Sequence, residues 1–553
     1  MKLDSVRLST EAFICAVSES GQCGKLRWEL GNDDQRFTFR LHSDGETEIR
    51  HISAFFRFPF EKHDMLYLNG YQSWTDSRER GVRGKMHSLN RVPKKLVEKY
   101  SLDRYGDNRF VEYGKKPGRQ HGFSYGYVRR GEEFTLFGSL AEESGFTILR
   151  FDTNENTITL EKDCAGHHFT GDYTVFDMVI LRGTEDEVFD EYFRLLNIPP
   201  AKAKRLTGYT SWYNLYENIS EKSIAADLKG FAGSKKLPDV FQIDDGYENA
   251  VGDWLIQNER FPHGMKAAAD SIREAGMLPG IWLAPFAAEK KSILVKEHPD
   301  WLLRDENGEP QMGGCNWSGF YGLEIYNPEV RAYLKEVFDT VIRGWGYGLV
   351  KLDFLYAACL IPRRDKTRAQ VMYDGMRFLR QLAGDALILG CGVPLAPAFG
   401  MVDYCRIGCD MTLNWLGDKI MRPLHREVPS TRNTLLNTVY RRHLDGRAWR
   451  NDPDVFLLRD DNIKLSMEQR ETLAAGNALF GGVLFTSDNV GAYDEEKRAV
   501  YERIEKLDRS CVTKIISTPS KLTIHYREGK KKRFYNKCWG SEAERLSYTQ
   551  HFS

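Results

Sequence analysis

The 553-residue chain has no excess of charge of either sign, because 78 Lys and Arg residues balance 78 Asp and Glu residues. This balance does not favour nucleic acid or an anionic membrane as a partner. Long apolar runs are also missing, and none approaches the length needed to cross a bilayer. The opening residues, Met1-Lys-Leu-Asp-Ser-Val-Arg7, contain no apolar segment, so we expect no signal peptide and a cytoplasmic protein.

Metal-binding patterns are scarce as well. The ten cysteines include no CxxC pair and no dense framework, which favours free thiols in a reducing compartment. Cys405 and Cys409 lie four residues apart, but no cluster of His or Cys accompanies them. The ends of the short apolar runs, where strands would end, carry no His-x-His. This argues against a metallohydrolase built on a β/α barrel. We therefore expect neither a metal nor a cofactor.

The chain is too long for a single core, and its patterns change along the sequence. Residues 1–200 contain short alternating or aromatic runs separated by Gly, Asn and Asp, which predicts a β-sandwich domain. Pro199-Pro200 and the basic stretch Lys202-Ala-Lys-Arg205 mark its boundary. Residues 509–553 contain two or three short apolar runs, which predict a small antiparallel β-domain.

Residues 201–508 alternate short apolar runs with longer helical patterns. This alternation predicts a central (β/α)8 TIM barrel and hence a multidomain α/β protein. The eight expected strands are 208–212, 240–244, 279–284, 349–354, 387–392, 404–410, 455–458 and 482–486.

The fourth expected strand, Tyr347-Gly-Leu-Val-Lys-Leu-Asp-Phe354, carries Lys351 and Asp353 in an otherwise apolar run. Because side chains alternate along a strand, both point to the same face. We expect the lysine to lower the pKa of Asp353 and keep it ionised, as a nucleophilic carboxylate requires. A structural ion pair is the alternative explanation.

Acidic or aromatic residues recur at the ends of the other strands. Asp244 and Asp245 follow the second strand, Trp282 lies on the third, and Arg406 and Asp410 share one face of the sixth. Each has a simpler explanation, such as a turn, a core side chain or a surface pair. Since TIM-barrel active sites lie at the carboxyl ends of the strands, their recurrence there indicates a site.

This pattern fits glycoside hydrolysis, in which two carboxyl groups flank the scissile bond. Asp353 would attack the anomeric carbon, and Asp410 would protonate the leaving oxygen and then activate water. Asp244 and Asp245 can accept hydrogen bonds from sugar hydroxyls, and tryptophan rings can stack on the sugar. A transglycosylase would share these residues, and a catalytically inactive sugar-binding protein would keep the Trp and Asp cluster.

Several motifs together resemble glycoside hydrolase family 36, the α-galactosidases or melibiases, of the compact bacterial type. The matching stretches are Gly208-Tyr-Thr-Ser-Trp-Tyr213, Phe241-Gln-Ile-Asp-Asp-Gly-Tyr247, Gly280-Ile-Trp-Leu-Ala-Pro-Phe286, His298-Pro-Asp-Trp301, Lys351-Leu-Asp-Phe354, Leu389-Gly-Cys-Gly392, Arg406-Ile-Gly-Cys-Asp410 and Asn451-Asp-Pro-Asp454. The resemblance implies an N-terminal β-supersandwich, a central barrel and a C-terminal antiparallel β-domain.

The resemblance also implies residue roles, with Asp353 as the nucleophile and Asp410 as the acid/base. The loop Gly70-Tyr-Gln-Ser-Trp74 resembles the family's N-terminal-domain loop that places a tryptophan over the site. The implied substrate-binding residues are Trp74, Trp212, Asp244, Asp245, Trp282, Lys351, Cys391, Gly392, Arg406 and Trp415.

One stretch departs from the pattern, because Met411-Thr-Leu-Asn-Trp415 follows the acid/base where relatives often carry other residues. The sequence therefore leaves open which leaving group the protein accepts and which substituent it accepts at carbon 2 of the sugar. We expect a retaining exo-α-galactosidase acting on small oligosaccharides such as melibiose or raffinose, with terminal α-N-acetylgalactosaminides as the alternative. Retention requires Asp353 and Asp410 carboxyl groups about 5 to 5.5 Å apart rather than about 6.5 to 9.5 Å.

Overall fold

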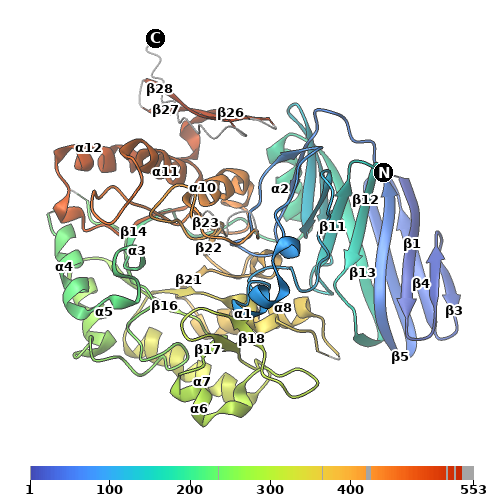
Figure 1. The fold of residues 1–553 in the computed structure, drawn as a ribbon, viewed down its shortest axis with the longest axis horizontal. Coiled ribbons are helices and arrows are strands. Elements are labelled where there is room, and N and C mark those ends of the chain that lie inside the picture. The colour runs from blue at the N-terminus through green and yellow to red at the C-terminus, as the bar shows by residue number, and fades with distance from the viewer. Residues whose placement is uncertain are drawn as a thin grey trace.

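The computed structural model describes residues 2–233, 236–363, 365–418, 425–518, 521–528 and 531–538. These residues form an antiparallel β domain, a central parallel β/α barrel and a small C-terminal antiparallel sheet (Figure 1). The predicted fold class is confirmed. The domain limits at residues 200 and 508 stay a prediction.

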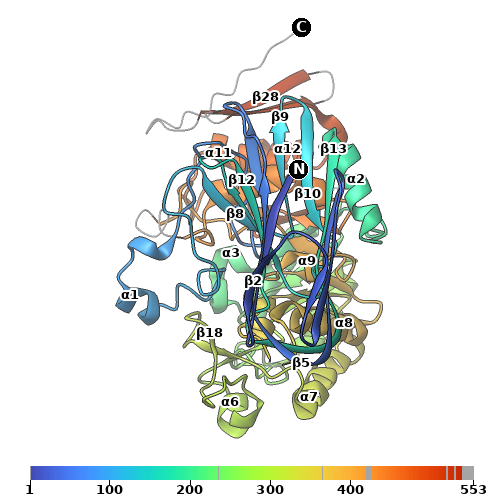
Figure 2. The ribbon, with the colours of Figure 1, turned by 90° about the vertical axis from the view of Figure 1, so that its right-hand side faces the viewer.

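The N-terminal domain is a 13-stranded antiparallel sheet with the main order β7-β6-β9-β10-β13-β5-β12-β11-β8. Its strands are β1 (Lys2–Thr10), β2 (Ile14–Val17), β3 (Gly21–Cys23), β4 (Leu26–Asn32), β5 (Arg36–Arg57), β6 (Met65–Leu68), β7 (Arg80–Gly81), β8 (Arg119–Phe123), β9 (Tyr125–Arg130), β10 (Glu133–Ser139), β11 (Thr147–Asp152), β12 (Thr157–Lys162) and β13 (His167–Gly183). Between β7 and β8 the chain leaves the sheet and forms α1 (Lys94–Lys99), which projects to one side (Figure 2).

Strand β5 joins two apolar runs that the sequence shows as separate, at 36–41 and 52–58. Asp44-Gly45 lies between them and reads as a turn, yet the strand continues through it for 22 residues. The chain stays extended there because β13 and β4 pair with its first half and β1 and β12 with its second. Phe37, Phe39 and Ile52 face the domain core and are fully buried.

The barrel sheet has the order β23-β22-β21-β20-β16-β15-β14-β25-β24, and every pairing in it is parallel. Its strands are β14 (Leu206–Thr210), β15 (Val240–Ile243), β16 (Leu278–Leu283), β20 (Leu349–Leu352), β21 (Leu387–Gly390), β22 (Tyr404–Arg406), β23 (Arg450–Asp452), β24 (Val455–Phe456) and β25 (Val483–Thr486). All eight predicted strands are present.

The seventh barrel strand differs from its prediction, because it is divided in two. Asn451-Asp-Pro-Asp454 was expected to precede this strand, but Arg450–Asp452 already pairs with β22 as β23. Pro453, which has no N–H to donate, interrupts the strand, and Asp454 adopts a φ of +76°. The second half, β24, then pairs with β25 and closes the barrel.

Most of the helices cover the barrel, whereas α2 (Glu185–Leu195) packs against β10 and β13 of the N-terminal sheet, and several helices begin at a side-chain cap. The remaining helices are α3 (Trp212–Leu215), α4 (Glu221–Phe231), α5 (Gly264–Glu274), α6 (Ile293–Glu297), α7 (Pro328–Phe338), α8 (Arg368–Ala383), α9 (Leu395–Ala398), α10 (Thr431–Tyr440), α11 (Met467–Phe480) and α12 (Glu495–Ile504). Ser220 caps α4, since its hydroxyl accepts a hydrogen bond from the N–H of Ser223. No helix of the described residues is long and apolar enough to span a bilayer.

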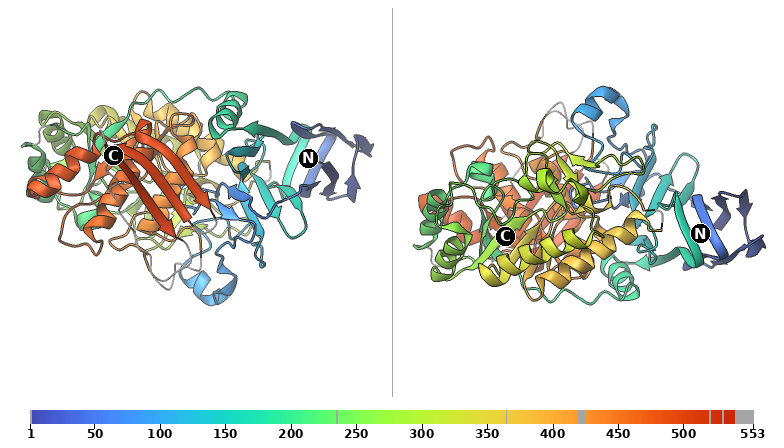
Figure 3. Two further views of the ribbon diagram at one scale, coloured as in Figure 1. Left: turned by 90° about the horizontal axis from the view of Figure 1, so that it is seen from above. Right: turned by 90° about the horizontal axis from the view of Figure 1, so that it is seen from below.

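The C-terminal sheet consists of β26 (Val512–Thr518), β27 (Lys521–Glu528) and β28 (Lys531–Cys538). It lies across the barrel helices at the upper end of the molecule (Figure 3, left). Ser517 connects it to both larger parts: its hydroxyl lies 2.8 Å from the Tyr440 hydroxyl, and its carbonyl accepts a hydrogen bond from Arg129 at 2.9 Å.

Candidate active site

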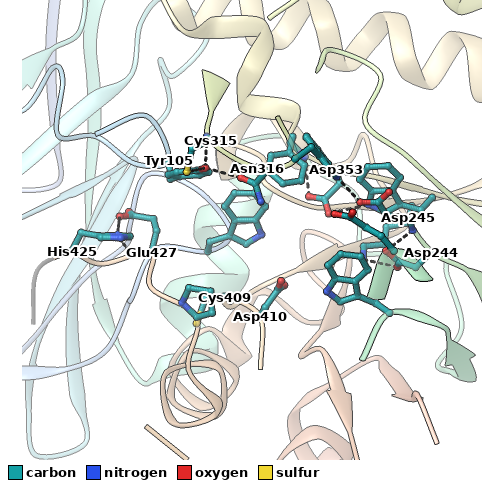
Figure 4. Close-up of a pocket in the computed structure, with 18 residues that line it drawn as sticks. Tyr105, Asp244, Asp245, Cys315, Asn316, Asp353, Cys409, Asp410, His425 and Glu427 are labelled. Carbon is teal, nitrogen blue, oxygen red and sulfur yellow. Dashed lines mark hydrogen bonds and ion pairs between the residues drawn. The ribbon is translucent and has the colours of Figure 1, made fainter. Parts of the chain in front are cut away.

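A cavity of about 460 Å³ opens at the carboxyl ends of the barrel strands, within the size range of ligand pockets. It is lined by Trp74, Tyr105, Trp212, Glu217, Asp244, Asp245, Trp282, Cys315, Asn316, Trp317, Lys351, Asp353, Phe354, Cys409, Asp410, His425, Glu427 and Pro429. Asp244, Asp245 and Asp353 gather at one end of it, and Tyr105, His425 and Glu427 lie at the other (Figure 4).

Asp353 lies directly after β20 and is buried, with 7% of its surface exposed. The next residue, Phe354, has a φ of +51°, a left-handed conformation that is strained for a large side chain. This backbone lets the N–H of Phe354 donate to Oδ1 of Asp353 at 2.8 Å. The indole Nε1 of Trp282 donates to Oδ2 at 3.2 Å, so both carboxyl oxygens are fixed in position.

The predicted effect of Lys351 on Asp353 is only partly right. Burial raises the pKa of Asp353 above its ordinary value, and the charge of Lys351 opposes this rise without reversing it. The expectation of a lowered pKa is therefore wrong. Lys351 instead makes its ion pair with Asp244, with 2.9 Å between Nζ and Oδ2.

Asp244 is held by donors from its own strand β15 and from strands β14 and β20. Its Oδ2 accepts hydrogen bonds from Thr210 Oγ1 at 3.1 Å, Gln242 Nε2 at 2.6 Å and Lys351 Nζ at 2.9 Å. Its Oδ1 accepts only the N–H of Asp245 among the described residues, at 3.0 Å. This oxygen retains capacity for one more donor, such as a hydroxyl group of a ligand.

Asp245 has a different environment, although it is the next residue. Its Oδ2 accepts a hydrogen bond from Trp317 Nε1 at 2.8 Å. Burial and the neighbouring carboxyl group of Glu248 raise the pKa of Asp245 well above its ordinary value. Burial likewise raises the pKa of Glu248, to about 7. This pair shares a proton more readily than two isolated carboxyl groups would.

Asp410, the second carboxyl group of the cavity, is more exposed to solvent than Asp353. Its side chain is 43% exposed and extends toward the cavity (Figure 4). Arg406 forms an ion pair with it, with 2.9 Å between Nη1 and Oδ1, although β22 ends at Arg406 and Asp410 lies beyond the strand. Arg406 also contacts Asp452 and Asp454, each at 3.0 Å. The charge of Asp410 contributes to the raised pKa of Asp353, so the two carboxyl groups interact electrostatically.

Trp74 comes from the β domain and closes one wall of the cavity. Its indole Nε1 lies 3.3 Å from Sγ of Cys391. Gly392 makes this approach possible, because a Cβ there would lie 2.8 Å from Cζ2 of Trp74 and 3.0 Å from the nitrogen of Phe354. With a φ of +54°, Gly392 also occupies a conformation that favours glycine.

A buried arginine of the barrel holds the Trp74 loop in place. Arg441 donates from Nη1 to the carbonyl of Ser73 at 2.6 Å and from Nη2 to that of Gln72 at 3.1 Å. The same guanidinium donates to the hydroxyl of Ser77 at 2.9 Å. Because the loop carbonyls bond to a charged group, the β domain and the barrel are fixed together at the cavity.

The structure brings most of the predicted site residues together. Eight of them line the cavity, namely Trp74, Trp212, Asp244, Asp245, Trp282, Lys351, Asp353 and Asp410. Cys391, Gly392 and Arg406 contact these lining residues from outside. Trp415 is buried away from the cavity wall, where its carbonyl accepts the N–H of Arg432 at 3.0 Å. The roles of all twelve stay predictions.

Sequence reasoning missed one half of the cavity. The missed lining residues are Tyr105, Glu217, Cys315, Asn316, Trp317, Phe354, Cys409, His425, Glu427 and Pro429. The stretch Gly313-Gly-Cys-Asn-Trp-Ser-Gly319 gave a usable signal, because a glycine-rich loop with polar and aromatic residues is typical of a binding loop. No sequence pattern marked Tyr105 or His425 as residues of a site. Nowhere in the described ranges do three His, Cys, Asp or Glu side chains form a group that could hold a metal.

Comparison with known proteins finds relatives among the α-galactosidases. The family model Melibiase matches residues 211–374. The solved structure of TtGalA, an α-galactosidase from Thermus thermophilus in complex with p-nitrophenyl α-D-galactopyranoside, matches with a TM-score of 0.71 and 27% identity, over 94% of this chain and 98% of that one. AgaA from Geobacillus stearothermophilus, a GH36 α-galactosidase, has a TM-score of 0.60 and 12% identity over 94% of this chain and 73% of its own, and shows the fold alone.

Two curated relatives align over shorter stretches. α-Galactosidase Mel36A from Lactobacillus acidophilus is 31% identical over 151 residues, which is 26% of this chain and 20% of the relative. The A type blood α-D-galactosamine galactosaminidase from Flavonifractor plautii is 27% identical over 183 residues, 30% of this chain and 17% of its own. The alignments therefore span about a fifth of the curated relatives' length.

A parallel β/α barrel with two carboxyl groups facing one cavity at the strand ends has the architecture of the barrel glycoside hydrolases. The motif order, the family model and the full-length match to a compact α-galactosidase agree with one another. The chain is similar to the melibiase family, glycoside hydrolase family 36, whose model matches residues 211–374.

Proposed function

We propose that the protein is a retaining exo-glycosidase that releases terminal α-linked galactose from small oligosaccharides. The observation that carries this proposal is the pair of carboxyl groups at one cavity, with Asp353 buried and Asp410 open. The full-length similarity to TtGalA, whose structures hold p-nitrophenyl α-galactopyranoside and stachyose, supports galactose as the sugar.

In this proposal Asp353 attacks the anomeric carbon and Asp410 protonates the departing oxygen. The bond between the anomeric carbon and that oxygen breaks as an ester forms with Asp353. Asp410, now a carboxylate, then takes a proton from water, whose oxygen attacks the anomeric carbon and releases Asp353. The hydrogen bonds from Phe354 and Trp282 fix the attacking carboxylate, so little reorganisation is needed during the reaction.

The residues around Asp353 supply the galactose site. The free capacity of Asp244 Oδ1 suits a sugar hydroxyl, while Lys351 offers its remaining N–H groups. Trp282 and Trp212 line the wall and can pack against the apolar face of the ring. Trp74 closes the site from the β domain, which favours cleavage at a chain end over cleavage within a chain.

A second candidate substrate is a terminal α-N-acetylgalactosaminide. The relative from Flavonifractor plautii, a galactosaminidase by name, supports this alternative. The same carboxyl groups would serve either sugar, and they would also serve transglycosylation if a sugar replaced water as the acceptor.

We further propose that the protein works in the cytoplasm. Nine cysteines, those whose side chains the structure describes, are free, as is typical of a reducing compartment. Its partner in this proposal is an oligosaccharide, with no nucleic acid or membrane involved.

The test is the hydrolysis of p-nitrophenyl α-galactoside and its α-N-acetylgalactosaminide counterpart by the wild type and by Asp353→Ala. We expect turnover of the galactoside and a loss of about 10⁴-fold or more in the variant, because no other group forms the ester. NMR of the first-formed sugar should show the α-anomer. Turnover of the acetamido sugar alone would move the substrate to the second candidate, and no turnover of either would refute glycosidase activity on these sugars.

A further inference from the structure

A second group of polar side chains lies at the end of the cavity away from Asp244 and Asp353 (Figure 4). We call Tyr105, Asn316, His425 and Glu427 the outer wall. Tyr105 lies in the segment between β7 and β8 that leaves the sheet of the β domain. Asn316 lies in the loop between β18 (Met312–Gly314) and β19 (Phe320–Gly322). His425 and Glu427 precede α10. None of the four lies at the end of a barrel strand.

Asn316 is held by one end of its amide and is free at the other. The hydroxyl of Tyr105 donates to Oδ1 of Asn316 at 2.6 Å and accepts the N–H of Cys315 at 2.8 Å. The amide nitrogen Nδ2 donates to no residue that the structure describes, and the side chain is exposed. Tyr105 therefore positions Asn316 and leaves two N–H donors for an oxygen of a ligand.

On the facing side, Glu427 is 5% exposed, and its two oxygens differ in their surroundings. Oε1 accepts a hydrogen bond from the hydroxyl of Thr75 at 2.9 Å. Oε2 receives no hydrogen bond within the described ranges and lies 3.4 Å from Nδ1 of His425. A buried carboxylate oxygen without a donor is costly, so this oxygen is suited to a hydroxyl donor from a ligand.

His425 adds a donor beside this acceptor. The backbone N–H of Glu427 donates to its Nδ1 at 3.2 Å, which places the proton of a neutral His425 on Nε2. Nε2 makes no hydrogen bond to any described residue. The outer wall therefore presents amide and imidazole N–H donors and a carboxylate acceptor, a combination that matches the hydroxyl groups of a sugar.

The position of the outer wall identifies which part of a substrate it would meet. The galactosyl ring belongs over Asp353, Asp244 and Lys351, which are buried at the inner end of the cavity. Asp410 lies between this end and the outer wall (Figure 4). The group that Asp410 protonates therefore leaves toward the outer wall.

We propose that Asn316, His425 and Glu427 bind the leaving group and select a hydroxylated sugar over an alkyl, aryl or lipid group, with Tyr105 positioning Asn316. This inference rests on the proposed α-galactosidase function and names its substrate class. Selection follows because an apolar leaving group would cover these polar groups without pairing them, which opposes its binding.

The experiment compares four galactosides: melibiose, raffinose, methyl α-galactoside and p-nitrophenyl α-galactoside. Methanol leaves with as much need of a proton as a sugar hydroxyl does, but it offers no hydroxyl groups to the outer wall. The variants are Tyr105→Phe, Asn316→Ala and Glu427→Gln. Tyr100→Phe is the matched control, because Tyr100 lies in the same segment between β7 and β8 and its side chain is 47% exposed.

We expect kcat/KM for melibiose and raffinose to fall about 5- to 50-fold in each variant, as when one or two hydrogen bonds to a substrate are lost. The values for methyl and p-nitrophenyl galactosides should stay within about twofold. Thermal unfolding of each variant checks that the fold is retained, which matters most for the buried Glu427.

Equal losses on all four substrates would overturn the inference, because they would show a general effect on the cavity. Unchanged kcat/KM for both oligosaccharides in all three variants would also overturn it. A wild type that cleaves the nitrophenyl galactoside but neither oligosaccharide would refute the leaving-group site and leave only the α-galactosidase chemistry standing. A wild type inactive on all four would instead refute the proposed function.

Discussion

The inner end of the cavity and its outer wall are built in different ways. Asp353, Asp244 and Arg406 lie at or just after the ends of parallel strands and are buried among protein donors and charges. Asn316 and His425 come from loops, and Asn316 is exposed with part of its hydrogen-bonding capacity unused. The inner end is thus preorganised to hold one sugar ring in one position, whereas the outer wall offers polar groups to whatever is attached to that ring.

This difference also appears in the electrostatics. Arg406 contacts three carboxylates, and burial raises the pKa of one of them, Asp454, to about 7 despite the arginine. Such a charge network is costly to bury, and it persists because each member has a partner. Among the described residues, Asn316 makes no ion pair, and its side chain hydrogen-bonds only to the Tyr105 hydroxyl.

The largest expected effect that separates the two regions comes from Asp410→Ala. We expect kcat/KM for raffinose and for methyl α-galactoside to fall about 10²- to 10⁴-fold, because both leaving groups need a proton. The nitrophenyl galactoside should lose far less, since nitrophenolate departs without one. Steady-state kinetics on the three substrates measures this, with the exposed Asp385→Ala as the control. Similar losses on all three would contradict the acid role of Asp410.

A smaller effect should follow from Gly392→Ala, which pushes Trp74 away from the inner end. We expect about a tenfold loss of kcat/KM on every galactoside, because a small displacement of the cavity wall disturbs the bound ring. Gly384→Ala is the matched control: Gly384 has a similar φ of +57°, but a Cβ there has nothing within 4 Å. If both variants lost the same activity, backbone strain alone would explain the result.

The smallest effect concerns the pH dependence of the inner end. Activity requires ionised Asp353, and burial raises its pKa, so the acid limb of kcat/KM should lie above that of an ordinary aspartate. Trp282→Phe removes a hydrogen bond that favours the ionised form. The acid limb should therefore move to higher pH, by less than about one pH unit. Trp345→Phe, a partly buried residue outside the cavity, is the control, and a shift to lower pH would contradict the argument.

The sequence determined the barrel and the inner end of the cavity. Parallel strands bring their carboxyl ends to one edge, so Asp244, Asp353 and Asp410 could be grouped from their places after apolar runs. The alternation along strand β20 placed Lys351 and Asp353 on one face. The sequence could not rank burial against the lysine charge, and the predicted direction of the Asp353 pKa shift was wrong for that reason.

Only the tertiary structure decided what surrounds these residues. Lys351 could have paired with either neighbouring carboxylate, and the strand order β20-β16-β15 placed Asp244, which follows β15, within reach of Lys351 across β16. The outer wall joins Tyr105 with Asn316, 211 positions apart, and Thr75 with Glu427, 352 apart. No periodicity or motif spans such distances, because these contacts depend on how the β domain docks against the barrel through Arg441 and the Trp74 loop.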